Sequence, residues 1–387
     1  MKKNKILFHY SMLNVGGAER SVVQLINMLV QHNWDVSLVL NVAGGTLENK
    51  LDSNVEIIHF FPKPWKNKIV SQQTILKKIG YLFLYLVPIL FYTLMTFFKK
   101  VSFRFKKYDA AVISLQGLNP SFVCNYVKAN KKFLYLRNDL SRSKKKEISE
   151  NIKKFNHLLD GYLCVSTTVL ESLDSINPSF KEKAHVLYNI VNIDEIILLS
   201  KEIEDPYKTF REEDCPILVT VCRMSDVSKG IFRQLEAAEI LKNEGLRFKW
   251  FFLGDGADLL GLKAKIKKKG MEEFIIPLGE KGNPYPYIKH CDIACVLSNY
   301  EGLSGVVNES KFLGKTLIAT EVSGIREQIT HLQNGFVVEN NLEGIVMGLR
   351  KLITNKELRL TLENNFLGSN IADNPIKLEK LEKLIKA

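Results

Sequence analysis

Short apolar runs alternate with amphipathic stretches along the chain, and this alternation restricts the possible folds more than any other feature. The first half has apolar runs at 5–10, 36–41, 55–60, 110–115, 132–136 and 161–165. The second half repeats the pattern at 217–221, 249–253, 274–277, 293–297, 316–319 and 335–338. Strands that are apolar throughout are typical of parallel sheets covered by helices on both faces. The sequence therefore predicts an α/β fold with two Rossmann-like, doubly wound halves.

The predicted helices and the linker divide these halves. Apolar residues recur at helical spacing in 18–31, 236–241 and 344–353. A polar, irregular stretch at 192–215 is the best linker candidate. We therefore predict an N-terminal domain over 1–193 and a C-terminal domain over 194–387, with a final helix at 375–387 that packs back on the first domain. A ligand cleft is expected at the carboxyl ends of the strands.

The positive charge of the chain is concentrated in one segment. The net charge is +12, and no Asp or Glu occurs between Ile57 and Tyr108. That segment holds the bases Lys63, Lys66, Lys68, Lys77, Lys78, Lys99, Lys100, Arg104, Lys106 and Lys107. Such clustering favours a local anionic partner over a general effect on solubility. Nucleic acid is not expected as that partner, because no nucleic-acid-binding motif accompanies the charge.

An uncharged apolar stretch, Ile79–Phe98, lies within this basic segment. It is long enough to span a bilayer, but a crossing would place strands of one sheet on opposite sides of the membrane. Two interpretations remain, a buried core helix or an interfacial element resting on anionic lipid, and the unopposed lysines favour the second. We expect the insertion at 62–107 to face the membrane. The sequence starts without a signal-peptide core, so we predict a cytoplasmic protein, peripheral on the inner face of the cell membrane.

Glycines and cations follow several predicted strands. Gly16 and Gly17 precede a predicted helix, where the backbone can approach an anion closely. Arg223 and Lys229 follow the strand at 217–221, and two cations beside a helix N-terminus suit a diphosphate. Gly254 begins a further glycine turn at a strand end. Each signal is weak alone, since glycine turns and solvated surface bases are common.

The strongest motif runs from Glu301 to Glu309. A strand is predicted to end at Ser298, and a helix to begin near Ser304 or Gly305. Loop and first-turn N–H groups can then bind phosphate or sugar oxygens, and the two carboxylates can accept sugar hydroxyls. The helix dipole alone would account for Glu309, but not for Glu301 together with the glycines.

Taken together, these motifs resemble those of retaining GT-B glycosyltransferases of family 4, a likeness that covers nearly the whole chain. Its marks, in order, are Gly16–Arg20, Val165-Ser166, Tyr188-Asn189, Arg223 with Lys229-Gly230, Gly254–Gly256, Asn283–Tyr285, Glu301 with Glu309, Ser323–Glu327 and Asn334–Phe336.

The resemblance implies a role for each matching residue. Arg223 and Lys229 would hold the donor diphosphate and stabilise it as it leaves, without a metal ion. Glu301 would lie beside the donor sugar and Glu309 would bind the ribose. The backbone beside sugar and phosphate would come from Gly302, Leu303, Ser304, Gly305 and Val306, with Gly254 behind it and with Gly16 and Gly17 approaching from the other domain.

Two positions depart from the family pattern. Arg137 stands where the family often has a histidine near the donor sugar. Arginine cannot act as a base near neutral pH but can bind charge, so we expect Arg137 among the catalytic residues, with Glu301, Arg223 and Lys229. Arg223 and Lys229 are one residue further apart than usual, so we expect the loop 225–228 to bulge.

The sequence thus predicts a glycosyltransferase, a hexosyltransferase, that moves a sugar from a nucleotide-sugar donor to a lipid-linked glycan acceptor during synthesis of a bacterial surface polysaccharide such as O-antigen, lipopolysaccharide or capsule. The alternative is a non-catalytic membrane-surface protein with a degenerate nucleotide-sugar site. Arg137 supports the alternative, whereas Glu301, Glu309 and both bases speak against it.

Overall fold

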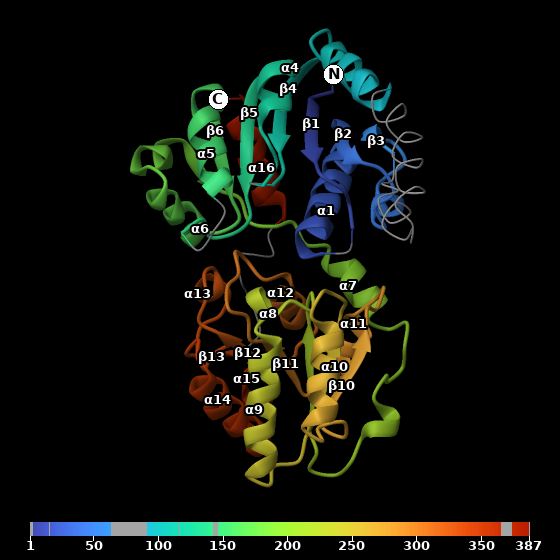
Figure 1. Cartoon of the computed structure of the whole chain (residues 1–387), viewed down its shortest axis with the longest axis vertical. Helices are drawn as coiled ribbons and strands as arrows, with labels where there is room; N and C mark the ends of the chain where they lie inside the picture. Colours follow the sequence, from blue (N-terminus) through green and yellow to red (C-terminus); the bar gives the residue numbers. More distant parts are fainter. Residues whose placement is uncertain are drawn as a thin grey trace, which may run out of the picture. The chain divides into compact units, whose positions relative to one another are not determined.

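The computed structural model describes residues 3–14, 16–62, 91–115, 117–141, 146–364 and 374–386. The chain divides into two compact units, each built around its own sheet (Figure 1). Unit 1 comprises Met1–Val165, Leu170–Ile190 and Asn374–Ala387. Unit 2 comprises Ser166–Val169 and Val191–Asp373.

Among the described residues, unit 1 holds a seven-stranded parallel sheet in the order β3-β2-β1-β4-β5-β6-β7. Its strands are β1 (Lys5–Tyr10), β2 (Asp35–Val42), β3 (Glu56–Phe61), β4 (Lys107–Ile113), β5 (Lys128–Leu136), β6 (Gly161–Cys164) and β7 (Ala184–Val186). Its labelled helices are α1 (Gly17–Gln31), α4 (Ser121–Tyr126), α5 (Lys146–Phe155), α6 (Thr167–Glu171), whose first turn is grouped with unit 2, and α16 (Asn374–Lys386). Residues 91–102 are also helical. Short 3-10 turns are η1 (Glu48–Lys50), η2 (Asn156–Leu158), η3 (Ser172–Ser175) and η4 (Pro178–Lys183).

Unit 2 holds a six-stranded parallel sheet, again among the described residues, in the order β10-β9-β8-β11-β12-β13. Its strands are β8 (Ile217–Val221), β9 (Lys249–Leu253), β10 (Ile275–Gly279), β11 (Ile293–Val296), β12 (Leu317–Thr320) and β13 (Phe336–Val338). Its helices are α7 (Ile193–Leu199), α8 (Asp226–Lys229), α9 (Ile231–Asn243), α10 (Leu259–Lys268), α11 (Tyr285–His290), α12 (Gly305–Phe312), α13 (Ile325–Gln328), α14 (Leu342–Thr354) and α15 (Lys356–Asn364), with the 3-10 turn η5 (Lys208–Phe210).

Both faces of the unit 2 sheet are buried, which explains why its strands are apolar at most positions. On β9, Trp250 and Phe252 belong to one core cluster, whereas Phe251 and Leu253 belong to another. Successive side chains of a strand point to opposite faces, so the two clusters lie on opposite sides of the sheet. The twelve predicted strands are confirmed, with ends that differ by a few residues. The short edge strand β7 was not predicted.

The predicted linker is not wholly irregular. It contains α7, whose first turn is capped by the Asn192 side chain accepting from the Glu195 N–H. Ile196 on this helix packs with Tyr285 and Ile288 of α11, so the segment is part of unit 2. The expectation of irregular structure was wrong over Ile193–Leu199, where five of the seven residues are apolar.

Only part of the predicted membrane-facing insertion can be described. Positions 63–90, which include 79–90 of the apolar stretch, lie outside the described residues, and 91–102 are helical. No helix in the described part of the chain is both long and apolar enough to cross a bilayer.

Candidate functional site

The unit 2 sheet has a topological switch point between β8 and β11. These strands are neighbours, yet β9 continues from β8 in one direction and β12 continues from β11 in the other. Loops that leave adjacent strands toward opposite faces leave a crevice at their carboxyl ends, where α/β proteins bind ligands. The loops after β8 and β11 carry Lys229 and Glu301, respectively.

The loop after β8 is shaped by one helical turn and a left-handed glycine. Asp226–Lys229 form α8, so the expected bulge at 225–228 is in fact a turn of helix. Gly230 follows with φ 58°, and a β-carbon there would lie 3.0 Å from the Asn299 side chain. Asn299 in turn donates to the Asp226 carbonyl at 2.9 Å. This turn places Lys229 at the edge of the crevice.

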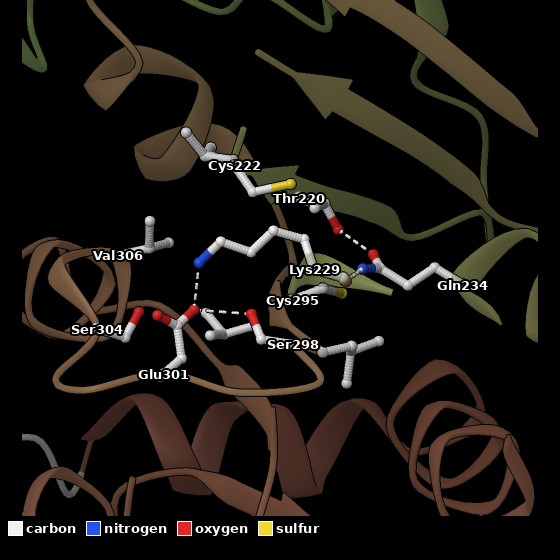
Figure 2. A pocket seen from close by; sticks show the side chains of 12 residues that line it. Thr220, Cys222, Lys229, Gln234, Cys295, Ser298, Glu301, Ser304 and Val306 are labelled. Carbon is white, nitrogen blue, oxygen red and sulfur yellow. Dashed lines mark hydrogen bonds and ion pairs between the residues drawn. The ribbon is translucent and has the colours of Figure 1, made fainter. Parts of the chain in front are cut away.

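Lys229 and Glu301 form a largely buried ion pair, with 2.5 Å between Nζ and Oε1. Figure 2 shows the Lys229 ammonium pointing at the carboxylate, while the Ser298 hydroxyl donates to the same oxygen at 2.7 Å. Burial lowers the pKa of Lys229, but the carboxylate of Glu301 raises it, and the resulting pKa lies above the ordinary lysine value. Lys229 is therefore a cation throughout the physiological pH range.

One small pocket brings several predicted site residues together. Lys229, Glu301, Ser304 and Val306 line it, beside Thr220, Cys222, Gln234 and Cys295 (Figure 2). Gln234 is fully buried and donates to the Lys229 carbonyl at 2.8 Å, which fixes the backbone under the ammonium. Neither Gln234 nor Ser298 was predicted as a site residue. Their partners Lys229 and Glu301 are close in the sequence, but no motif marks the glutamine or the serine itself.

Arg223 and Gly254 lie beside this pocket without lining it. The Arg223 side chain is exposed, and its charge is close enough to oppose protonation of Lys229. Gly254 has φ 140°, and a β-carbon there would lie 1.9 Å from the Cys222 carbonyl oxygen. The glycine is thus required by the packing of two loops, one after β8 and one after β9.

The loop Gly302–Ser304 leads into α12, which begins at Gly305 as predicted. Gly324, with φ 75°, packs against this loop so tightly that a β-carbon would lie 2.2 Å from the Gly302 carbonyl oxygen. Glu309 Oε1 lies 3.8 Å from the position of a β-carbon on Gly305. Its carboxylate therefore reaches back toward the first turn of the helix.

A four-residue segment after β6 supports the same loop. The Ser166 hydroxyl donates to the Gly302 carbonyl at 3.0 Å. The N–H groups of Thr167 and Thr168 donate to the Glu327 carboxylate at 2.9 and 3.0 Å. Glu327 thereby caps the first turn of α6 and joins Ser166–Val169 to unit 2.

The remaining predicted site residues belong to unit 1. Arg137 follows β5 and is only 5% exposed. It donates to the Ser114 carbonyl at 3.0 Å, to Ser21 Oγ at 3.2 Å and to Asn189 Oδ1 at 3.1 Å, and its guanidinium lies 4.1 Å from the Tyr135 ring centre. These acceptors are neutral, so the environment of Arg137 differs from that of Lys229.

The two glycines after β1 are not demanded by local packing. Gly16 has φ 179°, an extended conformation that any residue adopts. A β-carbon on Gly17 would meet no other atom of the described chain within 4 Å. Space at Gly17 is compatible with close approach of a ligand.

Comparison with known proteins agrees with this geometry. Residues 201–366, all in unit 2, match the family described as Glycosyl transferases group 1. A Campylobacter jejuni protein named N-acetylgalactosamine-N,N'-diacetylbacillosaminyl-diphospho-undecaprenol 4-alpha-N-acetylgalactosaminyltransferase is 29% identical over 192 residues, 49% of each chain. An uncharacterized glycosyltransferase of Haemophilus influenzae is 30% identical over 138 residues, 35% of this chain and 39% of its own. The match spans about half the length of the first relative and less of the second.

Solved structures extend the likeness to the whole chain. The structure of Anabaena HepE with UDP and glucose has a TM-score of 0.74 at 16% identity and covers 99% of this chain and 100% of its own. Staphylococcus aureus TarM, in a complex that contains UDP, has a TM-score of 0.70 at 14% identity and covers 100% of both chains. The fold is therefore GT-B, and unit 2 is identified as a glycosyltransferase domain that contains Arg223, Lys229, Glu301 and Glu309.

Proposed function

We propose that the protein is a retaining glycosyltransferase of family 4 that transfers a sugar from a nucleotide-sugar donor to a lipid-linked glycan. The observation that carries this proposal is the buried Lys229–Glu301 pair at the switch point of unit 2. A cation held there by a carboxylate can exchange that carboxylate for a diphosphate, which releases Glu301 toward the sugar. The relatives complexed with UDP make a uridine nucleotide the first donor to test.

The reaction requires stabilisation of a leaving diphosphate. The bond between the sugar C1 and the diphosphate oxygen breaks, the acceptor hydroxyl oxygen bonds to C1, and its proton passes to the departing phosphate. Retention requires that the new bond form on the face that the phosphate leaves. Lys229, with Arg223 beside it, would offset the negative charge that develops on that phosphate. We propose that these two side chains do so without a metal ion.

We propose roles for the remaining residues that agree with their places in unit 2. Glu301 would accept hydrogen bonds from sugar hydroxyls once Lys229 turns to the phosphate. Backbone N–H groups of the loop Gly302–Ser304 and of the first turn of α12 would bind phosphate or sugar oxygens. Glu309 would bind the ribose hydroxyls.

We also propose that the basic, aromatic region at 91–107 rests on an anionic membrane, on the cytoplasmic face, where a lipid-linked acceptor is found. Its large apolar side chains Phe91, Leu94, Phe97, Phe98 and Phe105 are at least half exposed. Lys99, Arg104 and Lys107 are exposed beside them, although Lys106 is paired with Glu56 at 2.7 Å. Exposed aromatic and basic side chains together are typical of interfacial membrane binding. The Campylobacter jejuni relative is named for an undecaprenol-linked acceptor, which makes undecaprenyl-diphosphate glycans the first acceptors to test for a role in surface polysaccharide synthesis.

A donor screen tests the proposed activity. The protein is incubated with UDP-, GDP- and dTDP-sugars, with and without an undecaprenyl-diphosphate glycan, and release of nucleoside diphosphate is measured. We expect acceptor-dependent release from one donor, with the anomeric configuration retained in the product. Nucleotide binding without any turnover would instead favour a non-catalytic protein with a remnant donor site.

A sedimentation assay tests the membrane proposal separately. The wild type is expected to bind vesicles that contain phosphatidylglycerol and to bind vesicles of pure phosphatidylcholine weakly. The double variant Phe98→Ser/Phe105→Ser should lose most of this binding and keep its affinity for the nucleotide. Equal binding of wild type and variant to anionic vesicles would contradict the proposed surface.

A further inference from the structure

We infer that Gln328 is a positioning residue for the donor site, because its side chain fixes the first turn of α12. The inference rests on the proposed function, since it concerns the same site. Gln328 ends α13 and is 2% exposed. It does not line the pocket that Lys229 and Glu301 share.

The Gln328 amide pairs with both backbone groups of Ser304, the residue that precedes α12. The Ser304 N–H donates to Gln328 Oε1 at 3.0 Å, and Gln328 Nε2 donates to the Ser304 carbonyl at 2.8 Å. Nε2 also donates to Asn308 Oδ1, one turn into the helix, at 2.9 Å. These three bonds use the amide oxygen and both amide hydrogens. One side chain thus sets the position of the helix start and of its second turn together.

The start of α12 lacks the usual side-chain cap and is restrained by Gln328. Ser304 occupies the N-cap position, yet in the described structure its hydroxyl makes no capping hydrogen bond to the first turn. In most helices an N-cap side chain satisfies one of the free N–H groups. Here the restraint comes from another helix, so the orientation of α12 is tied to α13.

The backbone of α13 is itself held in place. Lys311, two turns into α12, donates from Nζ to the Gln328 carbonyl at 2.6 Å. The close approach of Gly324 to the Gly302 carbonyl locks the start of α13 against the loop before α12. Gln328 therefore projects from a fixed support, which a positioning residue requires.

Displacement of this turn would reach the donor-binding groups directly. Ser304 and Val306 line the pocket, Glu301 precedes Ser304 by three residues, and Glu309 follows Asn308. A misplacement of about 1 Å in a group that binds the reacting molecule can cost about 10²-fold in rate. Loss of the Gln328 amide should therefore affect donor affinity more than it affects the fold of unit 2.

The variant Gln328→Met tests this inference, because it keeps an unbranched side chain of similar length and removes all three hydrogen bonds. The matched control is Thr316→Val. Thr316 is fully buried in unit 2 and donates to the Arg359 carbonyl at 3.0 Å, away from the start of α12. Affinities for UDP and for GDP are measured by calorimetry at a temperature well below both melting transitions, and KM and kcat are measured with the donor that the wild type uses.

We expect Gln328→Met to weaken nucleotide affinity and raise the donor KM about tenfold or more, while Thr316→Val lowers the melting temperature and leaves both unchanged. Asn308→Ala, which removes only one of the three bonds, should show a smaller effect of the same kind and serves if Gln328→Met does not fold. A wild-type affinity in Gln328→Met, or equal losses in Gln328→Met and Thr316→Val, would overturn the inference. Absence of nucleotide binding by the wild type would instead overturn the proposed function, and this inference with it.

Discussion

The two units share a topology but hold their buried cations in opposite ways. Both sheets are doubly wound, and in each a cationic side chain follows a strand at the carboxyl edge. In unit 2, Lys229 is paired with the carboxylate of Glu301. In unit 1, Arg137 is bound by neutral oxygens and lies over an aromatic ring. Lys229 can exchange its carboxylate partner for a phosphate. The Arg137 guanidinium is bonded to the surrounding backbone and side chains, so it is suited to hold unit 1 together.

The largest expected effect is the loss of sugar transfer when Lys229 is replaced. Lys229→Met should lower sugar transfer by about 10²–10³-fold, the usual consequence of removing a group that stabilises transition-state charge. The matched control is Lys269→Met, because Lys269 also forms a 2.5 Å ion pair, with Glu239, but lies away from the strand carboxyl ends. Initial rates with a saturating acceptor measure the effect. Equal losses of transfer activity in Lys229→Met and Lys269→Met would contradict a specific role of Lys229 in the reaction.

The second prediction concerns Arg137 and stability. Arg137→Met should lower the free energy of unfolding by about 2–4 kcal/mol, because buried partners lose hydrogen bonds to a charged group. Arg137→Lys keeps the charge but not the planar fork, and should lose part of that amount. Chemical denaturation measures both. If Arg137→Lys instead kept the stability and lost transfer activity, Arg137 would belong to the reaction, as the sequence analysis predicted.

The third prediction uses another buried cation of unit 2. Burial lowers the pKa of Lys311 to about 8, whereas in the unfolded chain it titrates near its ordinary value of about 10.4. Between these pH values the unfolded chain binds the proton more tightly, so stability should rise with pH from about 8 to about 10.4. The rise should be about 3 kcal/mol, because the two pKa values differ by about 2.4 units at ~1.4 kcal/mol per unit.

Lys311→Met is the control for this prediction, since it lacks the titrating group. The difference in unfolding free energy between wild type and variant should change across the window from pH 8 to 10.4 in favour of the wild type. Parallel pH profiles would mean that Lys311 is protonated to the same extent in both states.

The smallest expected effect on stability concerns Gly17, and Gly254 of unit 2 is its contrast. Gly17→Ala should change stability by no more than about 0.5 kcal/mol, because alanine suits a helix and the site has room for a methyl group. If a ligand approaches this backbone, transfer should nevertheless fall about tenfold. Gly254→Ala should destabilise unit 2 instead, since its β-carbon would overlap the Cys222 carbonyl. Unchanged activity in Gly17→Ala would remove unit 1 from the donor site.

Much of the fold could be predicted because the apolar runs are local signals. Most strands of both sheets contain a short apolar run, and the start of α12 at Gly305 follows from the loop before it. β7 was missed because Ala184-His185-Val186 is a short, half-buried edge strand without an apolar run. α7 was missed because it is a short helix of seven residues in a stretch that is otherwise mostly polar.

The site could be predicted only in part. Separate motifs predicted Lys229 and Glu301 as site residues. The contact between them joins positions 72 residues apart and depends on β8 and β11 being neighbours in the sheet. The role of Gln328 depends on the packing of α13 against α12, which no spacing in the sequence specifies. Three neutral acceptors of Arg137 likewise come from separate segments, at Ser21, Ser114 and Asn189.

The most direct test of this account is a crystal structure of the protein with bound UDP. We expect the diphosphate within hydrogen-bond distance of Lys229 Nζ at the carboxyl ends of β8 and β11, with the Lys229–Glu301 pair broken and the ribose at Glu309. A diphosphate bound at Arg137, or one bound with the Lys229–Glu301 pair intact, would contradict the assignment of the donor site to unit 2.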